Sequence, residues 1–74
     1  MWKEGALKVN SSIFKFWVKH FDEGSPFGIE NGRISKLMLK RNGTAVCCYD
    51  RGWDIHPVDA DTEIALEILK KEYN

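Results

Sequence analysis

Few side chains in this sequence could do chemistry: two histidines, two adjacent cysteines and scattered carboxylates. Histidine titrates near neutral pH, so His20 and His56 are the candidate general bases. Neither has a serine, cysteine or carboxylate at the spacing of a known catalytic constellation. We therefore expect structural or surface roles for both histidines, and we expect that the protein is not an enzyme.

The cysteines are Cys47 and Cys48, which are neighbours in a segment with strand composition. Adjacent side chains of a strand point to opposite faces, so these thiols should neither form a disulfide with each other nor share a metal ion. The sequence also lacks the two-residue-gap cysteine pairs of zinc sites and the glycine patterns of phosphate loops. We expect no metal and no cofactor, and two free thiols suit a reduced compartment such as the cytoplasm.

The most distinctive string is Tyr-Asp-Arg-Gly-Trp-Asp at residues 49–54. Arginine and tryptophan are frequent anchors of protein interfaces, so Arg51, Trp53 and Asp54 are candidate binding residues. The alternative is structural: Trp53 packs under the start of a helix, Gly52 supplies a bulge or a positive φ, and Arg51 pairs with a neighbouring aspartate. Such features more often serve packing than recognition.

A second candidate set combines cations with stacking surfaces on one face of the expected sheet. Its members are Lys15, Trp17, Lys19, Phe21, Lys36, Lys40 and Tyr49, and Met38 on the same face is a further candidate binding residue. Lysines interleaved with aromatic rings are typical of surfaces that bind nucleic acid. However, eleven Lys and Arg residues balance eleven Asp and Glu residues, whereas phosphate-binding proteins usually carry a basic excess. On this charge balance, nucleic-acid binding ranks second.

These side chains must be positioned by strands, because four segments show strand composition and alternation: 2–9, 13–22, 33–41 and 44–50. Asn42-Gly43 between the last two predicts a type I′ hairpin with positive φ at both residues. Counting outward from Arg41 opposite Thr44 pairs Leu39 with Val46 and Leu37 with Cys48. The opposite face would then carry Ile34, Lys36, Met38, Lys40, Ala45, Cys47 and Tyr49.

A helix is expected over residues 59–73, with Asp59 as N-cap, acidic residues in the first turn, and Lys70 and Lys71 in the last. Its apolar residues recur at helical spacing, so it should lie across the sheet. There it should bury Phe14, Phe16, Leu37, Leu39 and Val46. The glycine-rich segment 23–32 reads as an irregular connection.

The fold class is therefore α+β: one domain over residues 1–74, with an antiparallel sheet of three to four strands in 2–50, a corner at 50–57 and one C-terminal helix on one face. A chain of 74 residues has room for one thin core. No apolar run approaches a membrane span, and the first residues do not read as a signal peptide, so a cytoplasmic protein without a membrane partner is expected.

The string YDRGWDIHPVDADTEIALEILKKEYN, preceded by GRISKLMLKRNGTAV, resembles a family of short uncharacterised domains of Firmicutes, their phages and mobile elements. The resemblance covers most of the chain and is strongest from Gly32 onward. It implies a stand-alone cytosolic accessory protein and brings no activity, ligand or catalytic residue to these positions.

The leading functional expectation is a binding module that contacts a protein through the exposed sheet face and the 50–54 corner. A homodimer is its simplest form, because a two-faced sheet in so small a chain leaves apolar side chains to be covered. Those side chains are Ile13, Trp17, Phe21, Ile34 and Met38. The alternative is nucleic-acid binding on the same face, carried by Lys15, Lys19 and Lys36.

Overall fold

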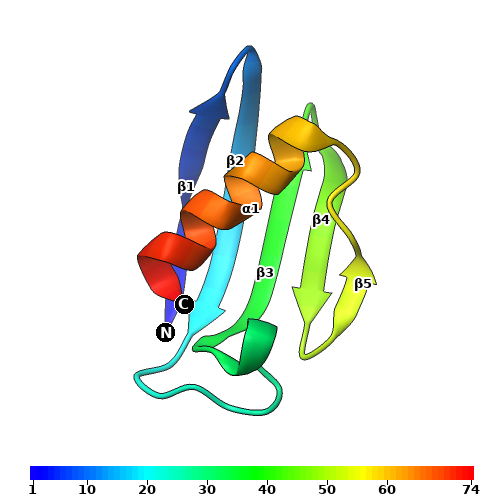
Figure 1. The fold of residues 1–74 in the computed structure, drawn as a ribbon. Helices are drawn as coiled ribbons and strands as arrows, with labels where there is room; N and C mark the ends of the chain where they lie inside the picture. The colour runs from blue at the N-terminus through cyan, green and yellow to red at the C-terminus, as the bar shows by residue number, and fades with distance from the viewer.

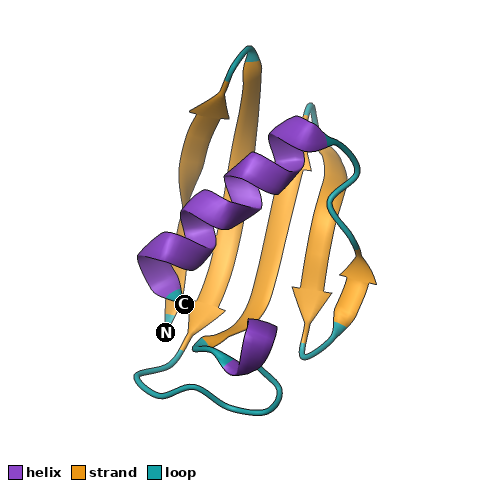
Figure 2. Cartoon of the chain, in the orientation of Figure 1, coloured by secondary structure: helices purple, strands orange, loops and turns teal.

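Strands form where apolar and polar residues alternate, and each strand pairs with the next one along the chain. The computed structural model describes all residues from Met1 to Asn74 (Figures 1 and 2). Its strands are β1 (Trp2–Val9), β2 (Ser12–His20), β3 (Ile34–Arg41), β4 (Thr44–Asp50) and β5 (Trp53–Ile55). They make one antiparallel sheet in the order β1-β2-β3-β4-β5.

The sheet has five strands, so the expectation of three to four was too low. The additional strand, β5, has only three residues, which is too short for alternation to reveal it. It forms because the chain reverses at Arg51, whose φ is 58°, and returns beside β4. The segment predicted as a corner therefore belongs partly to the sheet.

Both hairpin turns, the predicted one at Asn42-Gly43 and the one between β1 and β2, have residue types that tolerate a left-handed backbone. Asn42 has φ 54° and Gly43 has φ 78°, which confirms the predicted positive φ at both positions. In the β1–β2 turn, Asn10 adopts φ 54°. Asparagine tolerates this region better than most residues, because its short polar side chain can hydrogen-bond locally.

The helix α1 (Ala60–Tyr73) lies diagonally across one face of the sheet (Figure 1). The predicted N-cap is confirmed, since the Asp59 carboxylate accepts a hydrogen bond from the Thr62 backbone N–H at 2.9 Å. The core between helix and sheet includes Phe14, Val18, Leu37, Leu39, Val46, Ala65, Leu66 and Leu69. No helix of the structure is both long enough and apolar enough to cross a bilayer.

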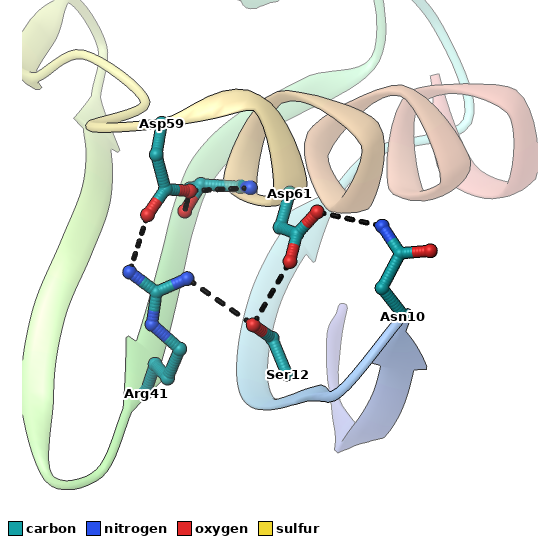
Figure 3. A network of polar contacts seen from close by, with 6 residues as sticks. Asn10, Ser12, Arg41, Asp59 and Asp61 are labelled. Carbon is teal, nitrogen blue, oxygen red and sulfur yellow. Dashed lines mark hydrogen bonds and ion pairs between the residues drawn. The ribbon is translucent and has the colours of Figure 1, made fainter.

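A polar network fastens the start of α1 to the tips of both hairpins (Figure 3). The Asp61 carboxylate accepts hydrogen bonds from Asn10 Nδ2 at 2.8 Å and Ser12 Oγ at 3.1 Å. Arg41 forms an ion pair with Asp59 and also donates to Ser12 Oγ at 3.4 Å. This is the densest polar cluster of the molecule, and its contacts hold the start of the helix against the two hairpins.

The far end of α1 is fastened to the short 3-10 helix η1 (Ile29–Asn31) and the start of β3. The Asn74 side chain accepts a hydrogen bond from the Ile34 backbone N–H at 2.9 Å and donates to the Ile29 carbonyl at 3.0 Å. Lys70 forms ion pairs with Glu30 and Glu67. The irregular connection between β2 and β3 is therefore tied to the helix.

Two β-bulges change which side chains share a face. The first lies between Lys19 and His20, where Lys19 pairs with Lys36 but His20 pairs with Ile34, so Ser35 is the extra residue. The bulge turns Ile34 to the helix side, where it is 0% exposed. The prediction that Ile34 lies on the opposite face was wrong.

The second bulge lies between β3 and β4. Arg41 pairs with Thr44 as predicted, but Leu39 pairs with Cys47 and Leu37 with Tyr49 rather than with Val46 and Cys48. Cys47 and Tyr49 are therefore buried on the helix side, and Cys48 takes the place predicted for them on the opposite face. The string Ala-Val-Cys-Cys-Tyr is apolar at every position, so alternation could not locate the extra residue.

Candidate functional site

The sheet face opposite α1 carries no other element, and we call it the open face. Strand pairing assigns it three rows of side chains across β1 to β4. The rows are Trp2, Lys19, Lys36 and Asp50; Glu4, Trp17, Met38 and Cys48; and Ala6, Lys15, Lys40 and Ala45. Six of the predicted binding residues lie together here: Lys15, Trp17, Lys19, Lys36, Met38 and Lys40.

The centre of the open face is apolar and slightly hollow. Trp17 and Met38 face each other across β2 and β3, and both are partly buried. A hollow of about 300 Å³ lies beside them, lined mostly by apolar side chains and including Trp2 and Cys48. This is the lower end of the size range of small-ligand sites. Trp2 was not among the predicted binding residues.

Four lysines surround this centre in two directly opposed pairs. Lys15 lies opposite Lys40, and Lys19 lies opposite Lys36. Like charges directly across two strands destabilise a sheet, so this arrangement carries an energetic cost. Only Lys36 among the four forms an ion pair, with its Nζ atom 3.7 Å from Asp50 Oδ1.

Two of the other three lysines, Lys19 and Lys40, lie over aromatic rings, which do not neutralise their positive charge. The Lys40 ammonium lies 5.7 Å from the Trp17 ring centroid. The Lys19 ammonium lies 5.9 Å from the Trp2 centroid and 5.6 Å from that of Phe21. A cation over a ring keeps its N–H donors, so these lysines can still bind an anion.

The open face has an excess of cations, and the helix has an excess of carboxylates. The open face carries five lysines, at positions 8, 15, 19, 36 and 40, against three carboxylates, at positions 4, 50 and 54. The helix carries Asp61, Glu63, Glu67 and Glu72 against Lys70 and Lys71. Although the net charge of the chain is zero, the open face is basic and the helix is acidic.

The 50–54 corner has mostly structural contacts. Arg51, not Gly52, has the positive φ, so the expected role of Gly52 was wrong. The Arg51 backbone N–H donates to the Ser35 carbonyl at 2.9 Å. The Arg51 guanidinium lies 4.9 Å from the Phe27 ring centroid instead of pairing with an aspartate.

The other members of the corner point in different directions. Trp53 contacts Tyr49 edge to face, with centroids 5.1 Å apart, and stacks on His56 at 4.9 Å. Tyr49 donates its hydroxyl hydrogen to the Phe27 carbonyl at 2.8 Å, so this predicted binding residue holds the β2–β3 connection. Asp54 lies on the open-face side, 3.9 Å from the Cys48 sulfur.

Two titratable groups outside the open face, His20 and Cys47, have pKa values shifted by burial. Burial is the main cause that lowers the pKa of His20, whose ring packs 5.2 Å from the Tyr73 ring and whose nitrogens have no hydrogen-bond partner. Burial raises the pKa of the Cys47 thiol to about 12, which keeps it protonated and a poor nucleophile. No three His, Cys, Asp or Glu side chains gather as a metal site would require.

Comparison with known proteins gives the family of this chain. A family model described as a domain of unknown function, DUF7678, matches residues 1–74. The chain belongs to the DUF7678 family. No curated protein and no solved structure matches the chain. Membership in DUF7678 agrees with the resemblance to an uncharacterised domain family and assigns no ligand to the open face.

Proposed function

We propose that this DUF7678 chain is a small non-enzymatic binding module whose open face binds single-stranded nucleic acid. The observation that carries the proposal is the pair of lysine oppositions, Lys15 with Lys40 and Lys19 with Lys36, on either side of Trp17 and Met38. Phosphate groups between the lysines would relieve the repulsion, and a base would stack in the apolar centre.

A single strand fits this surface better than a duplex does. The open face is broad, and neither a helix nor a ribbon projects from it that could enter a groove (Figure 2). Trp17 is partly buried in the sheet, so its ring can reach only a base that has left its own stack. Stacking on an aromatic side chain contributes about 1–3 kcal/mol per base.

The geometry favours this function over a symmetric dimer through the same face, which ranked first from the sequence. In a two-fold contact each patch meets its own copy, so a face with an excess of lysines would meet a second face with the same excess. The exposed apolar area that a dimer would cover is also smaller than expected. Ile34 lies in the core, and Trp17 and Met38 are partly buried.

The setting proposed with this function follows the sequence resemblance: an accessory protein of Firmicutes, their phages or mobile elements, acting in the cytoplasm. Two free cysteines, one of them buried, support a reducing compartment. An accessory role on single-stranded nucleic acid needs no catalytic residues.

Charge reversal on the open face tests the proposal. Lys15→Glu and Lys40→Glu should each weaken binding of a fluorescently labelled, mixed-sequence single strand, measured by anisotropy. Lys71→Glu on the exposed side of the helix changes the net charge equally and is the matched control. If four phosphates are neutralised, wild-type affinity should fall about 50-fold between about 50 and 200 mM salt. Absence of binding at low salt, or an equal effect of Lys71→Glu, would contradict the proposal.

A second candidate function, contact with a protein, is favoured by one feature of α1. Ile64 and Ile68 lie one turn apart on the outer side of the helix and remain 46% and 45% exposed. Apolar residues at this spacing are typical of helix-mediated contacts, with a second copy or with another protein. A partner on this stripe would leave the open face free.

A further inference from the structure

A second hollow, of about 360 Å³, lies at the end of the open face and is lined by cations and hydroxyls without any carboxylate. Its cations are Lys19, Lys36 and Arg51, and its hydroxyls belong to Ser25 and Ser35. These residues come from four separate segments, so no motif in the sequence could reveal the group. The fold gathers them because the β2–β3 connection and the β4–β5 turn lie at the same end of the sheet (Figure 1).

The first bulge builds the floor of this hollow. Ser35 is the extra residue there and is only 8% exposed. Its carbonyl accepts the Arg51 backbone N–H, which draws the β4–β5 turn against β3. Its hydroxyl donates only a long hydrogen bond, 3.4 Å, to the Lys19 carbonyl. A nearly buried hydroxyl with so weak a partner can turn toward a ligand.

The cations are held in place while their donors stay free. Arg51 rests on the Phe27 ring, and Lys19 lies beside the Phe21 ring. Lys36 has one ionic partner, Asp50, at 3.7 Å, and both side chains are well exposed. An exposed pair at that distance contributes little, so Lys36 can exchange Asp50 for a more highly charged anion.

The two hollows adjoin, since Lys36 lines both. A nucleotide whose base stacks beside Trp17 can therefore place its phosphate against Lys36 and Arg51. Ser25 and Phe27, from the β2–β3 connection, also line the second hollow, whose three cations suit a group with more than one negative charge. A terminal phosphate monoester carries about −1.5 to −2 charge at pH 7, more than the single charge of an internal diester.

We propose that Lys19, Lys36 and Arg51 form a phosphate site that holds the terminal phosphate of a strand bound on the open face. This inference rests on the proposed function and adds the preferred ligand: single-stranded nucleic acid with a phosphorylated end. Charge-assisted hydrogen bonds from lysine and the forked guanidinium of arginine suit that group.

The experiment compares one short oligonucleotide in three forms: with a 5′-phosphate, with a 3′-phosphate, and with neither. Competition anisotropy at constant salt should show that one phosphorylated form binds wild type about tenfold tighter than the unphosphorylated form. Arg51→Asn should remove most of this preference, because asparagine accepts the positive φ of position 51 but lacks the charge. Thermal melting of the variant checks that it folds.

Lys40→Ala is the matched control, since Lys40 lies on the open face but outside the second hollow. It should weaken all three oligonucleotides and keep the ratio between them. If the three forms bind equally to wild type, the phosphate site is overturned while the proposed function stands.

If no oligonucleotide binds, the proposed function fails. Titration with inorganic phosphate, followed by NMR at the Ser35 and Arg51 amides, then examines the phosphate site by itself. If phosphate shifts these amide signals in wild type but not in Arg51→Asn, the phosphate site is supported. If it does not shift them in wild type, the phosphate site is overturned. If a phosphoserine peptide binds more tightly than any oligonucleotide, the proposal that the phosphate belongs to a nucleic-acid strand is wrong.

Discussion

His20 shows at the residue scale how a side chain that resembles a catalytic base can be part of the packing. Its ring lies under Tyr73 at the end of α1, and both ring nitrogens are buried without a partner. A buried polar group without a hydrogen bond costs about 1–3 kcal/mol. The sequence predicts a structural or surface role for His20, because no partner residue accompanies it, but could not show that its ring nitrogens are buried.

The burial of His20 predicts a pH-dependent stability. Its pKa in the folded state is lowered from 6.5, chiefly by burial and then by the Met1 amino group, so protonation favours the unfolded state. Its contribution is therefore fully present above pH 6.5 and is lost as pH falls through the folded-state pKa. His20→Phe keeps the ring contact with Tyr73 and should flatten the dependence, as measured by urea unfolding at about pH 8 and pH 5.

The surface variant His56→Phe serves as the control for that measurement. His56 is exposed and stacks on Trp53, so this variant should keep the wild-type dependence on pH. A His20→Phe variant that loses stability on acidification as steeply as wild type would show that His20 is not the group responsible.

At the scale of elements, the hairpin and the helix were predictable because local chemistry fixes them. Asn42-Gly43 determines one turn, and Asp59 caps the helix. The bulges at Ser35 and in β4 were not predictable, because neighbouring residues there suit either face equally well. Each bulge moved part of the expected face: Ile34, Cys47 and Tyr49 turned out to belong to the helix side.

Two glycines give a matched test of the turn geometry. An added Cβ meets no atom within 4 Å at either Gly43 or Gly52, but only Gly43 has a positive φ, of 78°. Gly43→Ala should therefore destabilise the fold by about 1–2 kcal/mol through backbone strain alone. Gly52→Ala should change the free energy of unfolding by less than about 0.5 kcal/mol. Equal losses in urea unfolding would contradict these turn conformations.

At the scale of the whole molecule, the arrangement of charge matters more than its sum. The balance of eleven cationic and eleven acidic residues argued from the sequence against nucleic acid. The fold places Lys15, Lys19, Lys36 and Lys40 on the open face and four of the eleven acidic residues on α1. Composition averages over both sides of the sheet, so the sequence could supply the candidate residues but not their separation from the acidic ones.

The open face is the proposed binding surface, and an NMR map of the isotope-labelled protein tests this proposal directly. Titration with a short phosphorylated single strand should shift the amide signals of Trp17, Lys36 and Met38 and the indole signals of Trp2 and Trp17. The signals of Ile64 and Ile68, on the outer side of α1, should not move. Shifts confined to α1, or no shifts at low salt, would contradict the account.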